Sequence, residues 1–185
     1  PAGGNNPSTT VRHPADTLLP VRIAGDYFYE DKNSYTVSPY LLDSWTSGEL
    51  ILNNGTTVPV VEMNYDAFLD QVLCISPSRA AKVLVDKTAI RAFRLFPKTG
   101  KSRLFRRMPS IDSASPDIFA EVLTEGRISF YARRAMVYCR MEDVNRNGRM
   151  IQLRKIAAST TYYVLPPGGK MLLVRRLSKK AFLKL

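Results

Sequence analysis

The sequence predicts a mainly β protein: an antiparallel meander or barrel-like sheet, with an extended N-terminal arm and a short C-terminal helix. Short runs rich in β-branched and aromatic residues recur at regular spacing from Ser47 onward. Turn signals separate many of these runs, among them Asn53-Asn54-Gly55 and Pro166-Pro167-Gly168-Gly169. This spacing is typical of an antiparallel sheet in which consecutive strands are neighbours.

Residues 1–37 are predicted to form a flexible tether and an extended arm, and residues 38–185 a single β-rich domain. The first dozen residues offer almost nothing to bury. Between Pro14 and Tyr40, prolines and scattered aromatics suit an extended arm that lies against a surface. That surface belongs either to the same chain or to a partner, and both alternatives stay open.

The strands are expected in chain order, with limits set by the turn chemistry. After the last of them, Ser178 fits the N-cap of a short helix, and Ala181, Phe182 and Leu185 would share one face of it. The expected strands are residues 49–52, 58–63, 71–75, 81–85, 90–96, 102–106, 119–124, 127–132, 135–141, 150–157, 161–165 and 170–174.

Length and hydropathy fit one soluble domain with one core, because the chain has 185 residues of which 45% are hydrophobic. No run approaches the roughly 20 apolar residues of a membrane-spanning helix, so membrane association is expected to be peripheral. The chain begins with Pro1 rather than Met, which suggests a processed product.

The net charge of +11 is unevenly distributed along the chain. Residues 1–78 carry three basic and nine acidic side chains (3 − 9 = −6), and residues 79–185 carry 24 basic and seven acidic ones (24 − 7 = +17). This asymmetry can attract an anionic partner, or it can hold the acidic N-terminal part against the basic body.

The residues needed for common catalytic centres are missing, so the sequence predicts no enzyme and no cofactor. The single histidine, His13, lies in the tether, where nothing would orient it as a base. Cys74 and Cys139 lie in separate strand-like runs without metal-ligand spacing, either as two buried free thiols or as a disulfide between neighbouring strands.

Three local patterns resemble functional motifs but are incomplete or better explained as turns. Gly100-Lys101-Ser102 lacks the earlier glycine of a phosphate-binding loop, where Leu95 stands instead. The run 143–148 matches the start of a calcium loop, but the final glutamate position holds Arg154. Glu121 and Glu125 border a turn and are expected at a solvated hairpin rim rather than as an acid pair.

The strongest charge feature is the segment 79–107, which has ten basic residues and Asp86 as its only acidic one. Strand alternation predicts that Phe93 and most other aromatics face the core and that the arginines face outward. We therefore expect a solvated or partner-facing basic face. Its candidate binding residues are Arg91, Arg94, Lys98, Lys101, Arg103, Arg106 and Arg107.

Three groups of short motifs carry a family resemblance. The first is the run from Ser38 to Trp45, followed by Gly48 to Gly55 and Val60 to Asp66. The second is the hairpin from Phe119 to Tyr131, and the third comprises Tyr162-Tyr163-Val164, Gly168-Gly169 and the run from Leu177 to Leu183. These motifs resemble the opening, the middle and the C-terminal end of uncharacterised exported β-rich proteins of the Bacteroidota. The resemblance covers about residues 38–185, and it implies export to the periplasm or cell surface of a Gram-negative bacterium, with no catalytic residues to transfer.

Two triplets also fit the O-glycosylation pattern of exported proteins in that group. They are Asp16-Thr17-Leu18 and Asp112-Ser113-Ala114, in which Thr17 and Ser113 would carry the glycan. An intact mass equal to that of the bare polypeptide would rule this modification out.

The leading functional expectation is a non-enzymatic binding or structural subunit of a bacterial cell-envelope assembly. Its N-terminal arm and basic face would dock onto a larger envelope or outer-membrane protein complex. The alternative is an anion-binding module for nucleic acid or for an acidic glycan or lipid headgroup. Nucleic acid is the less favoured ligand, because basic proteins are a much larger class than nucleic-acid binders.

Overall fold

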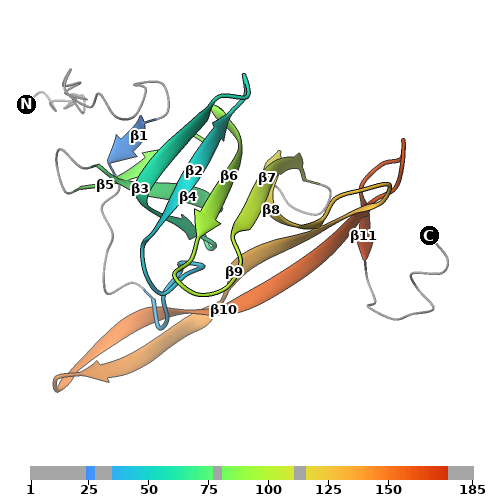
Figure 1. The fold of residues 1–185 in the computed structure, drawn as a ribbon. Helices are drawn as coiled ribbons and strands as arrows, with labels where there is room; N and C mark the ends of the chain where they lie inside the picture. Colours follow the sequence, from blue (N-terminus) through green and yellow to red (C-terminus); the bar gives the residue numbers. More distant parts are fainter. Residues whose placement is uncertain (1–23, 28–34, 77–80, 111–115, 175–185) are drawn as a thin grey trace, which may run out of the picture.

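The computed structural model describes residues 24–27, 35–76, 81–110 and 116–174, and these form one antiparallel sheet of eleven strands (Figure 1). The strand order is β1-β5-β4-β3-β2-β6-β7-β8-β9-β10-β11, so the sheet is open, with β1 and β11 at its ends. The strands are β1 (Ala24–Tyr27), β2 (Thr46–Leu52), β3 (Thr57–Asp66), β4 (Gln71–Ser76), β5 (Ala81–Val85), β6 (Ile90–Phe96), β7 (Arg103–Pro109), β8 (Asp117–Thr124), β9 (Ser129–Arg146), β10 (Arg149–Leu165) and β11 (Leu172–Val174).

The mainly β, antiparallel prediction is confirmed, and the described part of the chain contains no helix. The short helix expected after Ser178 lies outside the described residues. Among the residues that the structure covers, no helix is long and apolar enough to cross a membrane.

Four of the expected strands are joined into two long ones. The strands expected at 127–132 and 135–141 form one strand, β9, and those expected at 150–157 and 161–165 form β10. β9 and β10 pair along their whole length, from Arg146 opposite Arg149 to Ser129 opposite Leu165. No turn residues interrupt either run, so the ladder passes through both places with one irregularity at Lys155/Ile156. We call this two-stranded element the ribbon. At its tip, Asn147 and Gly148 have φ angles of 54° and 79°, as a tight Asn-Gly hairpin turn requires.

The sheet curls around a cluster of aromatic rings. Tyr65 of β3 contacts Phe93 of β6 and Phe105 of β7, with 5.4 Å between ring centroids in both cases. The Tyr65 ring also meets the ring of Phe119 of β8 edge-on at 6.3 Å, although β2, β6 and β7 lie between β3 and β8 in the sheet. Only a strongly curled sheet brings these strands together, and we call the concave side that holds these rings the inner face.

Isolated hydrogen bonds, not a strand ladder, join the two sides of the curled sheet. The main-chain amide of Phe119 in β8 donates to Asp70 Oδ1 in the β3–β4 turn at 3.1 Å. The amide of Met136 in β9 donates to the carbonyl of Ala67 in the same turn at 2.8 Å. The barrel-like expectation therefore holds for the curvature of the sheet but not for its closure.

A smaller core lies on the opposite face, where β7 to β10 meet. It consists of Met108, Ile118, Ala120, Tyr131 and Tyr163, all buried. Register places Met108 opposite Ile118 across β7 and β8, so strand alternation sends these side chains to the outer face. Both faces of β8 are therefore buried, which explains its nearly continuous apolar run.

The described parts of the N-terminal region pack against their own chain. β1 pairs with β5, and Tyr35 forms a parallel bridge with Arg154 of β10. Further along, the amide of Leu41 donates to the carbonyl of Tyr65 at 2.9 Å. For these residues, the surface that the arm covers belongs to the same chain.

Candidate functional site

The predicted basic face is divided among several places in the fold. Arg94 and Arg106 point outward, because their register partners Leu104 and Ala92 lie on the side opposite the aromatic cluster. Lys98 and Lys101 are exposed in the turn between β6 and β7. Arg91 is also exposed and lies beside the β2–β3 turn. A Cβ atom added to Gly55 in that turn would lie 3.8 Å from Arg91 Nη2.

Arg103 and Arg107 lie on the inner face instead. Arg103 is directly opposite the buried Leu95, and Arg107 is directly opposite the buried Phe119. The expectation that the arginines face outward is therefore wrong for Arg103 and Arg107. Their charges are tolerated on the inner face because Glu121 pairs with Arg103 and Asp117 pairs with Arg107. The sequence does not place these carboxylates next to them, since the partners come from other strands.

The first of these carboxylates is Glu121, which is only 8% exposed. Its Oε1 accepts from Arg103 Nε at 2.6 Å, and its Oε2 accepts from Arg103 Nη2 at 2.9 Å and from Arg134 Nε at 2.7 Å. Burial raises the pKa of Glu121, but these hydrogen bonds outweigh burial and the pKa lies below its usual value. The expected solvated rim is therefore wrong for Glu121 and fits only Glu125, which pairs with Arg106 at the surface.

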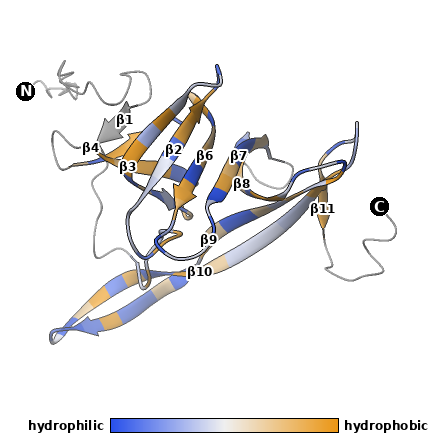
Figure 2. Cartoon of the chain, viewed as in Figure 1, coloured by the Kyte–Doolittle hydropathy of each residue, from blue (hydrophilic) through white to orange (hydrophobic). Residues whose placement is uncertain are grey.

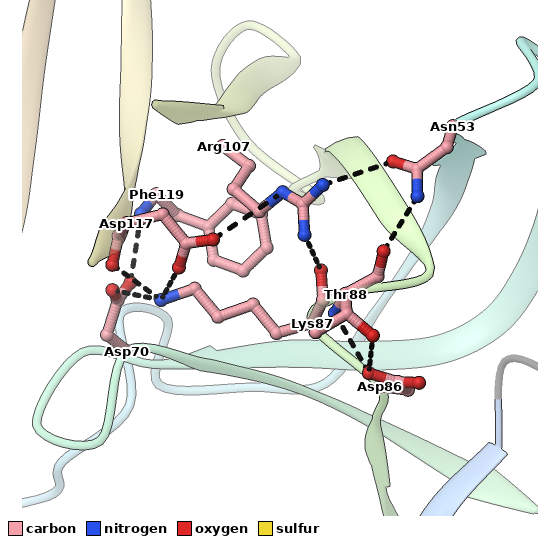
Figure 3. Close-up of polar contacts among 8 residues, drawn as sticks. All are labelled: Asn53, Asp70, Asp86, Lys87, Thr88, Arg107, Asp117 and Phe119. Atoms are coloured by element: carbon pink, nitrogen blue, oxygen red, sulfur yellow. Dashed lines mark hydrogen bonds and ion pairs between the residues drawn. The ribbon is translucent and has the colours of Figure 1, made fainter. Parts of the chain in front are cut away.

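A second charged cluster lies where the β3–β4 and β5–β6 turns meet β8 (Figure 3). Lys87 Nζ lies 2.7 Å from Asp70 Oδ2 and 3.2 Å from Asp117 Oδ1, and it donates to the Asp117 carbonyl at 3.0 Å. The same ammonium lies 5.2 Å from the centroid of the Phe119 ring. Its charge is thus held by two carboxylates and an aromatic face.

Arg107 extends this cluster to the β2–β3 turn. It donates to the carbonyl of Lys87 at 3.0 Å and to Asn53 Oδ1 at 3.2 Å, and its Nε lies 3.8 Å from Asp117 Oδ2 (Figure 3). Asn53 Nδ2 in turn donates to the carbonyl of Thr88 at 2.7 Å. The two cations thus pair with Asp70 and Asp117, and Asp86 accepts from the amide and hydroxyl of Thr88 in the same turn, so the cluster joins the three turns to β8.

Tyr65 completes the connection between this cluster and the aromatic core. Its hydroxyl donates to Asp70 Oδ1 at 2.5 Å. Burial raises the pKa of Tyr65 well above its usual value, and the charge of Asp70 raises it further. Tyr65 therefore remains a neutral hydrogen-bond donor over the whole physiological pH range.

The two cysteines have different environments. Cys74 is buried, Cys139 is exposed, and both are free. The expectation of free thiols is therefore confirmed for both residues, and the expectation of burial is confirmed for Cys74 only. Burial is wrong for Cys139, which lies at the irregular point of the β9–β10 ladder, and the alternative of a disulfide between neighbouring strands is wrong because β4 and β9 are not neighbours. Burial raises the pKa of the Cys74 thiol to about 12, which keeps it protonated.

No set of three or more potential metal ligands gathers among the residues that the structure describes. The calcium-like run 143–148 forms the end of β9 and the tip of the ribbon. There, Asn145 Oδ1 accepts from the amide of Gly148 at 3.0 Å, as expected for a plain hairpin turn. The possible glycosylation sites Thr17 and Ser113 lie outside the described residues.

The most prominent surface feature is the half of the ribbon nearest its tip, which we call the distal ribbon and define as residues 137–157. It extends away from the curled sheet as a two-stranded element (Figure 1). Apolar and polar residues alternate along it, which the hydropathy colouring shows (Figure 2). Tyr138, Met141 and Met150 are among its exposed residues. A projecting ribbon was not among the features predicted from the sequence, although two uninterrupted strand patterns on either side of the Asn147-Gly148 turn are its signal.

No known protein family, curated protein or solved structure matches this chain.

Proposed function

We propose that this chain is a non-enzymatic binding or structural subunit of a bacterial cell-envelope assembly. The observation that carries the binding part is the distal ribbon, which exposes large apolar side chains such as Tyr138, Met141 and Met150 although its Leu153 and Ile156 are buried. Export and the envelope setting rest on the family resemblance, and the association with the membrane would be peripheral.

The placement of the charged side chains supports a docking role rather than catalysis. The buried and half-buried ionic groups around Glu121 are paired with opposite charges from the neighbouring strands, and those around Lys87 with carboxylates from another turn and from β8. These pairs hold the curled sheet together, so they serve the fold. Exposed cations and apolar groups remain on the outside, where a partner can reach them.

Native electrophoresis of the tagged full chain, extracted from its source bacterium in mild detergent, tests this proposal. We expect the chain to migrate in an assembly much larger than one chain, and to be enriched in the envelope fraction. Migration as a free single chain in every detergent tried would contradict the proposal.

An anion-binding module is the second candidate, favoured by the two exposed lysines of the β6–β7 turn and by the two guanidiniums around the single Glu121 carboxylate. Retention on heparin should then fall steeply with salt, and Lys98→Ala with Lys101→Ala should shift elution to lower salt. If retention on heparin changes neither with salt concentration nor with the two lysine substitutions, anion binding is contradicted.

A further inference from the structure

Register separates the charges of the distal ribbon onto one face. Strand alternation places four basic side chains and one acidic one on the same side, which we call the basic face (4 − 1 = +3). The opposite side carries Arg154 and Asp143, whose charges cancel (1 − 1 = 0). The charged residues of the basic face are Arg140, Glu142, Arg146, Arg149 and Lys155.

The part of the basic face nearer the curled sheet is covered and its charge is compensated. Leu153 on this face is only 2% exposed. Glu142 lies 3.1 Å from Lys155 Nζ and 4.0 Å from Arg140 Nη2. The part that a partner can reach is therefore the far end of the hairpin, residues 144–151, which we call the ribbon tip.

The ribbon tip combines positive charge with apolar side chains. It contains two basic and no acidic residues, and both of the basic ones, Arg146 and Arg149, are exposed. Val144 and Ile151 lie opposite each other beside the arginines and are half-buried. Met150, on the other side of the hairpin, is 65% exposed. A partner that meets the tip end-on would thus contact cations and apolar groups together.

The size of the ribbon tip argues against a protein as its occupant. A stable protein interface takes about 20–30 residues from each partner, whereas the tip has eight (144–151). A lipid bilayer needs no complementary shape. Its anionic headgroups attract arginine side chains near the surface, and the apolar parts of the tip can reach the boundary between headgroups and acyl chains.

Two other occupants fit the ribbon tip less well. A second copy would bring the same arginines against each other. Nucleic-acid duplexes are typically held by about six to ten phosphate contacts, but the tip supplies two cations. Val144, Met150 and Ile151 also offer no hydrogen bond to a base edge.

We propose that the ribbon tip binds the surface of an anionic lipid bilayer. Arg146 and Arg149 lie at the level of the lipid phosphates, and Met150 reaches the boundary of the acyl chains. The ribbon extends away from the curled sheet, so its tip can touch a bilayer while the rest of the chain stays outside it (Figure 1). This inference rests on the proposed function, because it names the element through which an envelope subunit would contact the membrane.

Flotation of the purified full chain with lipid vesicles tests the inference. One set of vesicles contains phosphatidylcholine alone, and the other contains about one third phosphatidylglycerol. We expect an about tenfold higher partition coefficient for the anionic vesicles, and we expect the bound fraction to fall as salt is raised.

Charge reversal provides the matched comparison. Arg149→Glu should lower partitioning into the anionic vesicles by about tenfold. Arg127→Glu makes the same charge change at an exposed arginine before the other end of β9, and should change partitioning less than about twofold, because charges beyond a Debye length from the lipid are screened. Equal thermal unfolding temperatures of the two variants would show that neither change acts through the fold.

A polarity-sensitive fluorophore reports whether the tip enters the lipid surface. It is attached at Met150→Cys in a chain that also carries Cys139→Ser, and the buried Cys74 should stay unlabelled. We expect its emission to shift to shorter wavelengths with anionic vesicles. The same fluorophore at Val61→Cys, a position 77% exposed on β3, should not shift.

Several outcomes would overturn the inference: equal partitioning into the two kinds of vesicle, partitioning unaffected by Arg149→Glu, an unchanged emission at position 150, or tighter binding to duplex DNA that Arg149→Glu abolishes. Native electrophoresis from the source bacterium separates the two proposals. A large assembly whose purified chain does not bind vesicles overturns only the membrane contact. A free single chain that binds them overturns the assembly and leaves the membrane contact standing.

Discussion

Gly48 lies where the neighbouring strands leave no room for a side chain. A Cβ on this residue would lie 2.2 Å from Met63 Sδ and 2.3 Å from the carbonyl oxygen of Arg94. Gly48 is register partner to Val60 on one side and to Leu95 on the other. The close approach of these backbones is thus possible only with glycine here.

We expect Gly48→Ala to lower the free energy of unfolding by about 2 kcal/mol, because the Met63 side chain can shift but the Arg94 carbonyl belongs to the ladder. Urea denaturation of the purified chain measures this change. Gly126→Ala is the control, since the nearest atom to its added Cβ is 4.0 Å away. Equal stabilities of the two variants would contradict the steric argument.

Glu121 links stability to pH. Because its pKa in the folded chain lies below that in the unfolded chain, its ion pairs stabilise the fold fully above the usual glutamate pKa of about 4.3. This contribution is lost as the pH falls through the lower, folded-state pKa.

Glu121→Gln should therefore lower the free energy of unfolding by about 2 kcal/mol at pH 7, and the difference from the unmodified chain should shrink below about pH 4. Denaturation curves over a pH series measure this. Glu125→Gln, at a more exposed pair with Arg106, should cost less than about 1 kcal/mol at every pH. A difference for Glu121→Gln that does not change with pH would be inconsistent with the pairing.

At the scale of elements, the curled sheet is held by contacts between turns and strands that are distant in the sheet order. Lys87 in the β5–β6 turn and Asp70 in the β3–β4 turn both bind β8. Asp70 has a φ of 56°, a conformation that aspartate tolerates better than most residues. This conformation belongs to a turn from which the carboxylate reaches Tyr65, Lys87 and the amide of Phe119.

Lys87→Met should cost about 2 kcal/mol of unfolding free energy, because Asp70 and Asp117 would lose their shared cation. Adding Asp70→Asn should cost less in that variant than in the unmodified chain, since the two residues interact directly. Chemical denaturation of the four proteins measures the coupling. Additive losses would mean that the Lys87–Asp70 pair does not help to hold the curled sheet together.

At the scale of the whole molecule, the curled sheet and the distal ribbon differ in how they are stabilised. β2, β6 and β7 each pair on both sides and bury their inner face. The end of the ribbon near Asn147 has only its own two strands, and such an isolated hairpin is marginally stable in water.

Hydrogen exchange should therefore show two levels of protection. Amides in residues 143–152 are expected to exchange by local opening, about 100-fold or more faster than the ladder amides of β6. Mass spectrometry of peptides from timed labelling measures both regions in one sample. Equal protection in the two regions would mean that the ribbon opens only when the whole sheet unfolds.

Much of the fold follows from the sequence, because strand alternation and turn chemistry are local. The Asn53-Asn54-Gly55 and Asn147-Gly148 turns occur where the sequence predicts them, and Phe93 and Leu95 face the core as their alternation predicts. The candidate binding arginines stand out in the sequence because they lie in the strongly basic segment 79–107, and their role in binding stays a prediction.

The tertiary structure decided which partners meet. The sequence by itself determined the antiparallel β class, the positions of the turns and the excess of positive charge, since each depends on neighbours along the chain. Curling of the sheet brought Glu121 between Arg103 and Arg134 and put Lys87 beside Asp70, and these contacts join strands that are far apart in sequence. The ribbon likewise required the pairing of β9 with β10 over their whole length, because only that pairing places Tyr138, Met141 and Met150 on the same side of it.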